Sequence, residues 1–193
     1  MHSPDYNPLN HANRRILLDL ASASIRHGLA TGRPIPVDLA TLPPALTGPR
    51  ATFVTLQKHG ELRGCIGCLE AHRPLAEDIA ANAFAAAFRD SRFAPVTGEE
   101  FHHLEIHLSL LTPATPMVFR SEKDLLSQLA PGQDGLIMEE GPHRGTFLPS
   151  VWTSLPDPQD FLRHLKLKAG LPGNYWSPSL EVRRYRTESI QEP

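Results

Sequence analysis

The sequence lacks any stretch near the roughly 18–20 uninterrupted apolar residues that a membrane-spanning helix requires, so we expect no membrane segment. Its first residues, Met1–Tyr6, contain no basic region leading into an apolar core, and we expect no secretory signal. Only 2 cysteines occur in 193 residues, too few for a disulfide framework. These absences predict a cytoplasmic protein whose thiols are reduced.

An excess of charge of one sign is also absent. The chain carries 19 Lys and Arg against 21 Asp and Glu, a formal net charge of −2. Nucleic-acid-binding surfaces usually require a basic excess, so this balance argues against a nucleic-acid partner. With 40% apolar and 21% charged residues the composition is that of a globular protein, and the length predicts a single domain over residues 1–193.

Hydrophobic periodicity without regular βαβ alternation predicts an α+β fold, with a mainly antiparallel sheet flanked by helices. Asn10 is a candidate helix cap, and His27-Gly28 is the candidate end of that helix. Five prolines between residues 34 and 49 exclude a long helix or a central strand there. We therefore expect residues about 10–50 to supply a helix and an extended arm that packs onto the domain.

Local turn and capping signals predict the remaining elements. They are a hairpin over 51–69 with His59-Gly60 in its turn, a helix opened by Pro74, a strand over 104–110, a hairpin over 135–148, a helix over 158–168 that stops at Gly170, and a strand over 180–185. We expect disorder at residues 1–8 and after Glu188, because chain ends are usually the least constrained.

The most informative segment is Glu61–Glu70 (ELRGCIGCLE), which contains both cysteines. Side chains alternate along a strand, so Arg63 and Cys65 are expected on one face, about 6.6 Å apart. At that distance a guanidinium would favour the thiolate of Cys65, which is the nucleophilic form. Gly64 and Gly67 have no side chains and would let a ligand or another backbone come close.

Three other interpretations of the two cysteines stay open. Cys65 and Cys68 could form a redox pair, although the next helix starts near Pro74 and not at the motif. Together with His59 and His72 they would make a zinc site with short loops. Both could also be small buried residues on a packed strand, with no chemical role.

Two further polar clusters are candidates for a site. Glu105, His107 and Ser109 alternate on one face of a strand, but residues spaced by two are about 6.6 Å apart, too far for a hydrogen-bonded triad. We interpret His107 as pocket lining and a candidate base. Asp90 and Arg92 form either an ion pair at the exit of a helix or an anion site, since arginine offers a bidentate fork. No sequence motif predicts a cofactor or a metal.

Five segments of the chain, taken in order, follow one family pattern. They are Leu62–Gly67, Phe88–Pro95, Ser109–Pro113, Asp134–Leu136 followed by Gly145–Trp152, and Phe161–Leu171. Together they resemble the AMMECR domain family, whose prokaryotic members are called AmmeMemoRadiSam system protein A, over about residues 10–188. The sequence departs from the pattern at Cys68, where the family more often has Thr or Ser, at Ser150, which replaces a common Gln, and at His107, where an acidic residue is frequent.

The resemblance implies an α+β fold with a smaller attached lobe, and it implies no particular reaction. Family members are associated by name and gene neighbourhood with a Memo-type protein and a radical SAM protein, which the resemblance therefore implies as pathway partners. One hypothesis is a small-molecule or modification enzyme using Cys65; the other is a non-catalytic binding or scaffold module that presents the same groove to a metabolite or partner protein. The candidate catalytic residues are Cys65, Arg63 and His107, and the candidate binding residues are Gly64, Gly67, Asp90, Arg92 and Ser109.

Overall fold

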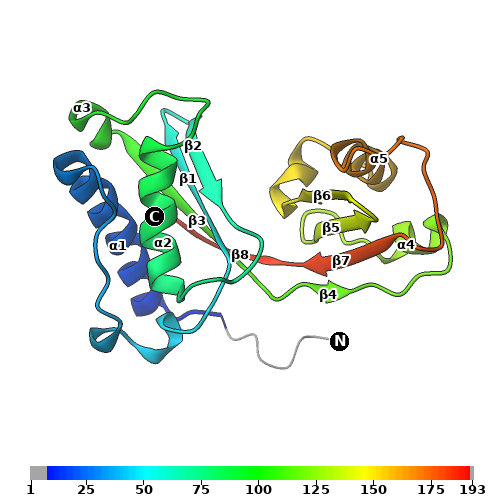
Figure 1. Ribbon diagram of the computed structural model, residues 1–193, viewed down its shortest axis with the longest axis horizontal. Coiled ribbons are helices and arrows are strands. Elements are labelled where there is room, and N and C mark those ends of the chain that lie inside the picture. The colour runs from blue at the N-terminus through cyan, green and yellow to red at the C-terminus, as the bar shows by residue number, and fades with distance from the viewer. Residues whose placement is uncertain (1–7, 192–193) are drawn as a thin grey trace. The chain divides into compact units, whose positions relative to one another are not determined.

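The structure, a computed structural model, describes residues 8–191 and divides into two compact units. The first unit runs up to Leu111 and resumes at Glu188, and the second is Thr112–Thr187. Each contains a four-stranded sheet and helices (Figure 1). The α+β class is confirmed, with the strands divided between two sheets, while the assignment of 1–193 to a single domain stays a prediction.

The helices and strands have the following bounds. The first unit contains α1 (His11–Thr31), β1 (Thr52–Lys58), β2 (Glu61–Gly67), α2 (Leu75–Phe88), α3 (Gly98–Phe101), β3 (Leu104–Leu111) and, from Glu188 on, β8 (Thr187–Gln191). The second unit contains β4 (Thr115–Pro116), α4 (Glu122–Gln128), β5 (Gly135–Glu140), β6 (His143–Phe147), α5 (Pro158–Lys168) and β7 (Glu181–Tyr185). Among residues 8–191 no helix is both long and apolar enough to cross a membrane.

The sheet of the first unit has the strand order β2-β1-β3-β8, and β1 pairs antiparallel with both β2 and β3. The predicted β1–β2 hairpin is confirmed. Its turn residues His59 and Gly60 have φ values of 54° and 78°, the positive values that a two-residue hairpin turn requires. Val54 and Leu56 are fully buried in the core with α1 and α2, so these helices cover one face of the sheet (Figure 1).

Helix α1 starts as expected but ends later. The Asn10 side chain accepts a hydrogen bond from the N–H of Asn13 and caps the helix. The predicted end at Gly28 is wrong, because α1 continues to Thr31 and ends at Gly32, which has φ 69°. Gly28 has a packing role instead: a Cβ there would lie 2.5 Å from the Phe88 ring of α2.

The proline-rich arm that follows α1 packs onto the first unit. It contains only two short 3₁₀ turns, Leu39–Thr41 and Pro44–Leu46. Leu46 is fully buried in the same core as α1 and α2. Further along the chain, after β2, Pro74 is the N-cap residue of α2 and not, as predicted, its first helical residue.

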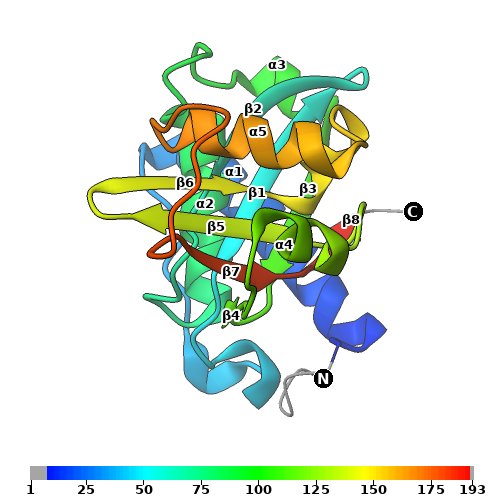
Figure 2. The same ribbon diagram turned by 90° about the vertical axis from the view of Figure 1, so that its right-hand side faces the viewer.

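The sheet of the second unit has the order β4-β7-β5-β6, and α5 lies across β6 (Figure 2). Trp152 stacks on Phe161 of α5 with ring centroids 3.7 Å apart. The predicted 135–148 hairpin, the 158–168 helix with its stop at Gly170 and the last predicted strand are confirmed by β5–β6, α5 and β7.

The C-terminal segment differs from the expectation of disorder after Glu188. Strand β8 continues to Gln191 and lies beside β3. The buried Glu188 carboxylate accepts a hydrogen bond from the N–H of Leu9, and Ile190 is buried in the first core. These long-range contacts order the segment. The other expected disorder was at residues 1–8, and residues 1–7 of that range lie outside the described residues.

Candidate functional site

The face of the first sheet that the helices leave uncovered carries a row of four polar side chains. Cys65 of β2 and His107 of β3 both lie directly opposite Thr55 of β1, so the three side chains share one face. On β8, the Oε1 atom of Gln191 lies 3.0 Å from Nδ1 of His107. We call these four residues the Cys65 row.

Within this row the Cys65 sulfur has a specific partner. The Thr55 hydroxyl donates a hydrogen bond to Sγ over 3.2 Å, and Cys65 is half-buried. The N–H of Cys65 donates to Asp90, so Thr55 and Cys65 form a non-hydrogen-bonded pair, in which facing side chains approach most closely. A hydrogen bond donated to sulfur favours its negatively charged form.

Asp90 and Arg92 hold the main chain of Cys65 from the open side of β2, the edge strand of the sheet. Asp90 Oδ2 accepts from the Cys65 N–H at 2.9 Å, and Arg92 Nη2 donates to the Cys65 carbonyl oxygen at 3.3 Å. Arg92 also donates a hydrogen bond to each carboxylate oxygen of Asp90, from Nε at 2.9 Å and from Nη2 at 2.7 Å. We call this pair the Cys65 clamp.

Both clamp residues are charged at neutral pH. The Arg92 hydrogen bonds hold the pKa of the buried Asp90 carboxyl well below its usual range, against the opposing effect of burial. The pKa of Arg92 is raised, mainly by its hydrogen bond to Asp90 and further by the Asp90 charge. Arg92 is therefore the cation that accompanies Cys65.

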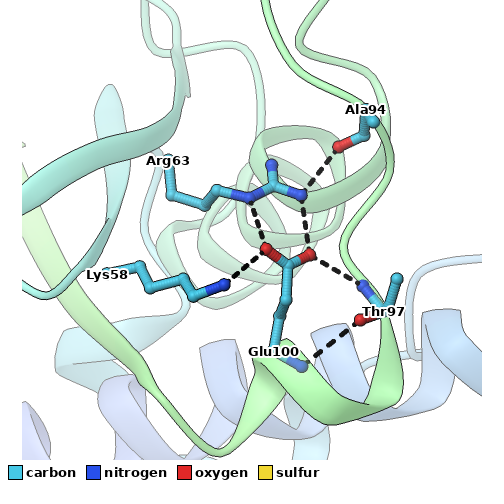
Figure 3. Close-up of polar contacts among 5 residues, drawn as sticks. All are labelled: Lys58, Arg63, Ala94, Thr97 and Glu100. Carbon is cyan, nitrogen blue, oxygen red and sulfur yellow. Dashed lines mark hydrogen bonds and ion pairs between the residues drawn. The ribbon is translucent and has the colours of Figure 1, made fainter.

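Arg63, which the sequence predicted to be the cation beside Cys65, points to Glu100 instead. The pairing register shifts between Leu56 and Gln57, so that Leu62, and not Arg63, shares the face of Cys65. The Arg63 guanidinium forms a fork with Glu100 of α3 at 3.2 and 2.9 Å and donates to the carbonyl of Ala94 (Figure 3). Because of this bulge, the prediction that Arg63 and Cys65 share one face of the strand is wrong.

Glu100 is the centre of this second cluster, and sequence reasoning missed it. Lys58 joins Arg63 on the carboxylate at 3.0 Å, and the hydrogen bonds from Arg63 and then Lys58 lower the pKa of Glu100 to about 2 (Figure 3). Thr97 and Glu100 form a capping box at the start of α3. That Thr-x-x-Glu spacing is the sequence signal that could have located the helix.

The protein itself occupies the space beside Gly64 and Gly67. A Cβ on Gly64 would lie 2.2 Å from the carbonyl oxygen of Ala86, because the α2 backbone packs directly on the strand. A Cβ on Gly67 would meet the Phe53 ring at 2.3 Å. The expected close approach is therefore made by a helix backbone and an aromatic ring, and the space predicted for a ligand at these positions is taken.

The three polar residues of β3 lie in three successive rows: Glu105 opposite Gln57, His107 opposite Thr55 and Ser109 opposite Phe53. Ser109 lies opposite Phe53 in the row next to Cys65, and Glu105 Oε2 is 3.9 Å from Nε2 of His107. His107 is thus the member of the predicted cluster that the structure brings into line with Cys65, with Thr55 between them.

The residues of the alternative zinc site are not assembled. His59 lies beside His103 with ring centroids 5.7 Å apart, and His72 is 3.7 Å from Glu70. The Cys68 sulfur hydrogen-bonds to the main chain of Glu70. Across residues 8–191 no group of three or more His, Cys, Asp or Glu side chains is placed to hold a metal ion.

Comparison with known proteins identifies the family. The AMMECR1 family model matches residues 18–190, nearly the whole chain. The chain belongs to the AMMECR1 family. The match includes Leu62–Gly67, which in the structure lies in strand β2, with Cys65 held by the clamp.

Relatives within the AMMECR1 family cover almost the full length. A protein of Methanothermobacter thermautotrophicus is 37% identical over 191 residues, covering 97% of this chain and 98% of its own. A protein of Methanocaldococcus jannaschii is 37% identical over 176 residues, with 89% and 86% covered. The crystal structure of an uncharacterised protein from Pyrococcus horikoshii superimposes with a TM-score of 0.84 at 33% identity, covering 94% of this chain and 92% of that one.

Proposed function

We propose that this AMMECR1-family protein is an enzyme that modifies a small molecule or a macromolecule, with the Cys65 sulfur as its nucleophile. The observation that carries this proposal is the 3.2 Å hydrogen bond from the Thr55 hydroxyl to Sγ. A hydroxyl that donates to sulfur stabilises the thiolate, and the thiolate is the reactive form of cysteine. His107, one strand beyond Thr55, is the histidine of the same row that can receive a proton.

The other predicted site residues have supporting roles in this proposal. Asp90 and Arg92 fix the main chain of Cys65, and Arg92 brings a positive charge to the Cys65 carbonyl oxygen. Arg63 acts at a distance, because it binds Glu100 and thereby ties α3 to the bulge in β2. We assign no direct chemical role to Arg63.

The proposal includes a place in a pathway. Family association links AMMECR-type proteins with a Memo-type protein, similar to extradiol dioxygenases, and with a radical SAM protein. We therefore propose that the compound modified at Cys65 is a product or a substrate of one of these partners. The association of names and gene neighbourhoods supports this part of the proposal, and the geometry of the Cys65 row supports the chemistry.

Alkylation tests the nucleophile directly. The intact protein is treated with iodoacetamide at pH 7, and peptide mass spectrometry follows Cys65 and Cys68 separately. We expect Cys65 to react several-fold faster than Cys68 and faster than the same cysteine in guanidinium-unfolded protein, because only the fold supplies Thr55 and Arg92. Cys65→Ser, with Cys68 still present, controls for the peptide assignment.

The opposite result is equally informative. If Cys65 stays inert until the protein unfolds, it is a structural residue, and that result contradicts the proposed enzymatic function. The non-catalytic binding module then becomes the function to test, with charge reversal at Arg92 as the first variant.

A further inference from the structure

We propose that the substrate modified at Cys65 carries an anionic oxygen group, a carboxylate or a phosphate, which binds the guanidinium of Arg92. This inference rests on the proposed function, because it names the chemical class of the compound that Cys65 would attack. Three observations carry it: one guanidinium nitrogen of Arg92 has no protein partner, the rest of the guanidinium is held in place, and Arg92 contacts Cys65 itself.

The guanidinium of Arg92 is only partly used by the protein. Nε and Nη2 donate to the two carboxylate oxygens of Asp90, and Nη2 also donates to the Cys65 carbonyl oxygen. Nη1 makes no hydrogen bond to any residue within 8–191. The Arg92 side chain is 55% exposed, so an anion from solution has access to it and can accept the N–H groups of Nη1.

Arg92 is held in one orientation before any ligand arrives. The two hydrogen bonds to Asp90 fix the plane of the guanidinium, and its central carbon lies 5.4 Å from the centre of the Phe93 ring. A side chain that is already ordered loses little conformational entropy when it binds a ligand. The hydrogen bond to Asp90 also raises the pKa of Arg92, so the guanidinium keeps its charge.

The charges around Arg92 leave this region positive in spite of its carboxylate partner. A second cation, Arg63, lies 5.8 Å from the centre of the same Phe93 ring. Arg63 and Lys58 both pair with the single carboxylate of Glu100. The two ion clusters together therefore contain three cations and two carboxylates, and the remaining positive charge attracts an anion.

Arg92 and the Cys65 sulfur are close enough to serve one small molecule. Nη2 of Arg92 lies 3.3 Å from the Cys65 carbonyl oxygen. That oxygen and Sγ belong to the same residue, so ordinary covalent geometry keeps Nη2 and Sγ within about 8 Å of each other. A molecule with its anionic group next to the carbon that sulfur attacks spans such a gap, because the hydrogen bond to Arg92 adds about 2.9 Å.

Iodoacetate and iodoacetamide test this inference, because the first is an anion and the second is neutral. In both reactions the Cys65 sulfur forms a bond to the CH₂ carbon, and iodide leaves with the bonding electron pair. The rates at Cys65 and Cys68 are measured in the intact protein at pH 7 and constant ionic strength. We expect the ratio of the iodoacetate rate to the iodoacetamide rate to be about tenfold higher at Cys65 than at Cys68, the size of one hydrogen bond between charged groups.

Protection by simple anions identifies the group that binds. Acetate and inorganic phosphate are added separately, with sodium chloride of the same ionic strength as the reference. We expect at least one of them to slow the iodoacetamide reaction of Cys65 in a saturable way and to leave Cys68 unchanged. Stronger protection by acetate indicates a carboxylate substrate, and stronger protection by phosphate indicates a phosphorylated one.

Matched variants assign the effect to Arg92. Arg92→Gln alone would leave the Asp90 carboxylate unpaired, and that charge would repel iodoacetate. Asp90→Asn combined with Arg92→Gln removes both charges together, and the new amide oxygen can still accept from the Cys65 N–H. This double variant should lose the preference for iodoacetate and the protection by anions. Arg15→Gln, which removes an exposed arginine that pairs with Asp19 on α1, should keep both within about twofold.

Each contrary outcome has a distinct meaning. If Cys65 reacts with iodoacetamide no faster than Cys68, the proposed function is overturned and the substrate class falls with it. If Cys65 is fast but shows no greater preference for iodoacetate than Cys68, or if neither anion protects it, the anion site is overturned and the nucleophile stands. A preference that survives in the double variant also overturns the anion site, because Arg92 would not be its source.

Discussion

Cys65 lies on an edge strand, and the side chains of Asp90 and Arg92 supply the hydrogen bonds that a neighbouring strand would otherwise make. Unpaired edge groups invite association with another chain, so the clamp also protects the edge. Its chemical consequence is specific: the Cys65 N–H is already committed to Asp90. That N–H is not free to bind an oxyanion while the clamp is closed, so a charge developing on a substrate must be met by other groups.

Gly64 gives a residue-scale prediction about the same strand. Gly64→Ala puts a Cβ 2.2 Å from the Ala86 carbonyl oxygen, which belongs to a helix backbone and cannot easily move. We expect a loss of about 1–3 kcal/mol in the free energy of unfolding, measured by chemical denaturation. Gly48→Ala is the control, because nothing lies within 4 Å of its added Cβ. Equal stability of the two variants would contradict the close packing of α2 on β2.

At the scale of elements, local patterns predicted the hairpins and longer helices well, and the bulge in β2 is where they failed. A regular two-residue hairpin that pairs Lys58 with Glu61 would place Thr55 opposite Gly64. One extra residue in β2 instead places Thr55 opposite Cys65 and turns Arg63 to Glu100. Alternation cannot reveal a bulge, so the predicted face of Arg63 was wrong and Thr55 was missed.

The link between the bulge and α3 gives a pH-dependent prediction. Arg63 and Lys58 lower the pKa of Glu100 from its ordinary 4.5 to about 2, so the folded state binds this proton less readily than the unfolded state. The resulting stabilisation is complete above about pH 5 and is lost as pH falls from about 4.5 towards 2. Glu100→Gln should cost about 1–2 kcal/mol at pH 7 after solvent screening, and clearly less at pH 3.

Denaturation at several pH values checks this, with Glu99→Gln as the matched control. Glu99 is an exposed acid on the same helix, and its removal should change stability by less than about 0.5 kcal/mol. A Glu100→Gln effect that is the same at pH 7 and pH 3 would show that the ion pair with Arg63 does not stabilise the fold.

At the scale of the whole molecule, long-range pairing is what the sequence could not reveal. His107 and Gln191 are 84 residues apart, and their contact exists only because β8 returns to lie beside β3. The whole second unit is inserted between these two strands of the first. Nothing in a short stretch of sequence encodes that return, which is why the C-terminal residues were expected to be disordered and why Gln191 was not a candidate.

The same insertion predicts two separate unfolding transitions. The buried residues form two clusters with no common member: Leu56 belongs to the first core and Leu165 to the second, and both are fully buried. Both tryptophans, Trp152 and Trp176, lie in the second unit, while both cysteines lie in the first. Tryptophan fluorescence therefore reports one unit, and the iodoacetamide reactivity of Cys65, which is expected to fall when its surroundings unfold, reports the other.

Two matched core truncations use this separation. Leu165→Ala should lower the stability measured by fluorescence by about 2–4 kcal/mol and leave the thiol transition unmoved, because each core loses contacts only within itself. Leu56→Ala should do the reverse. If instead both probes shift together in both variants, the chain unfolds as one cooperative domain and the units are not independent. In that case damage anywhere in the second core would also remove the contacts that Thr55 and Arg92 make with Cys65, and the reactivity of Cys65 would depend on the stability of the whole chain.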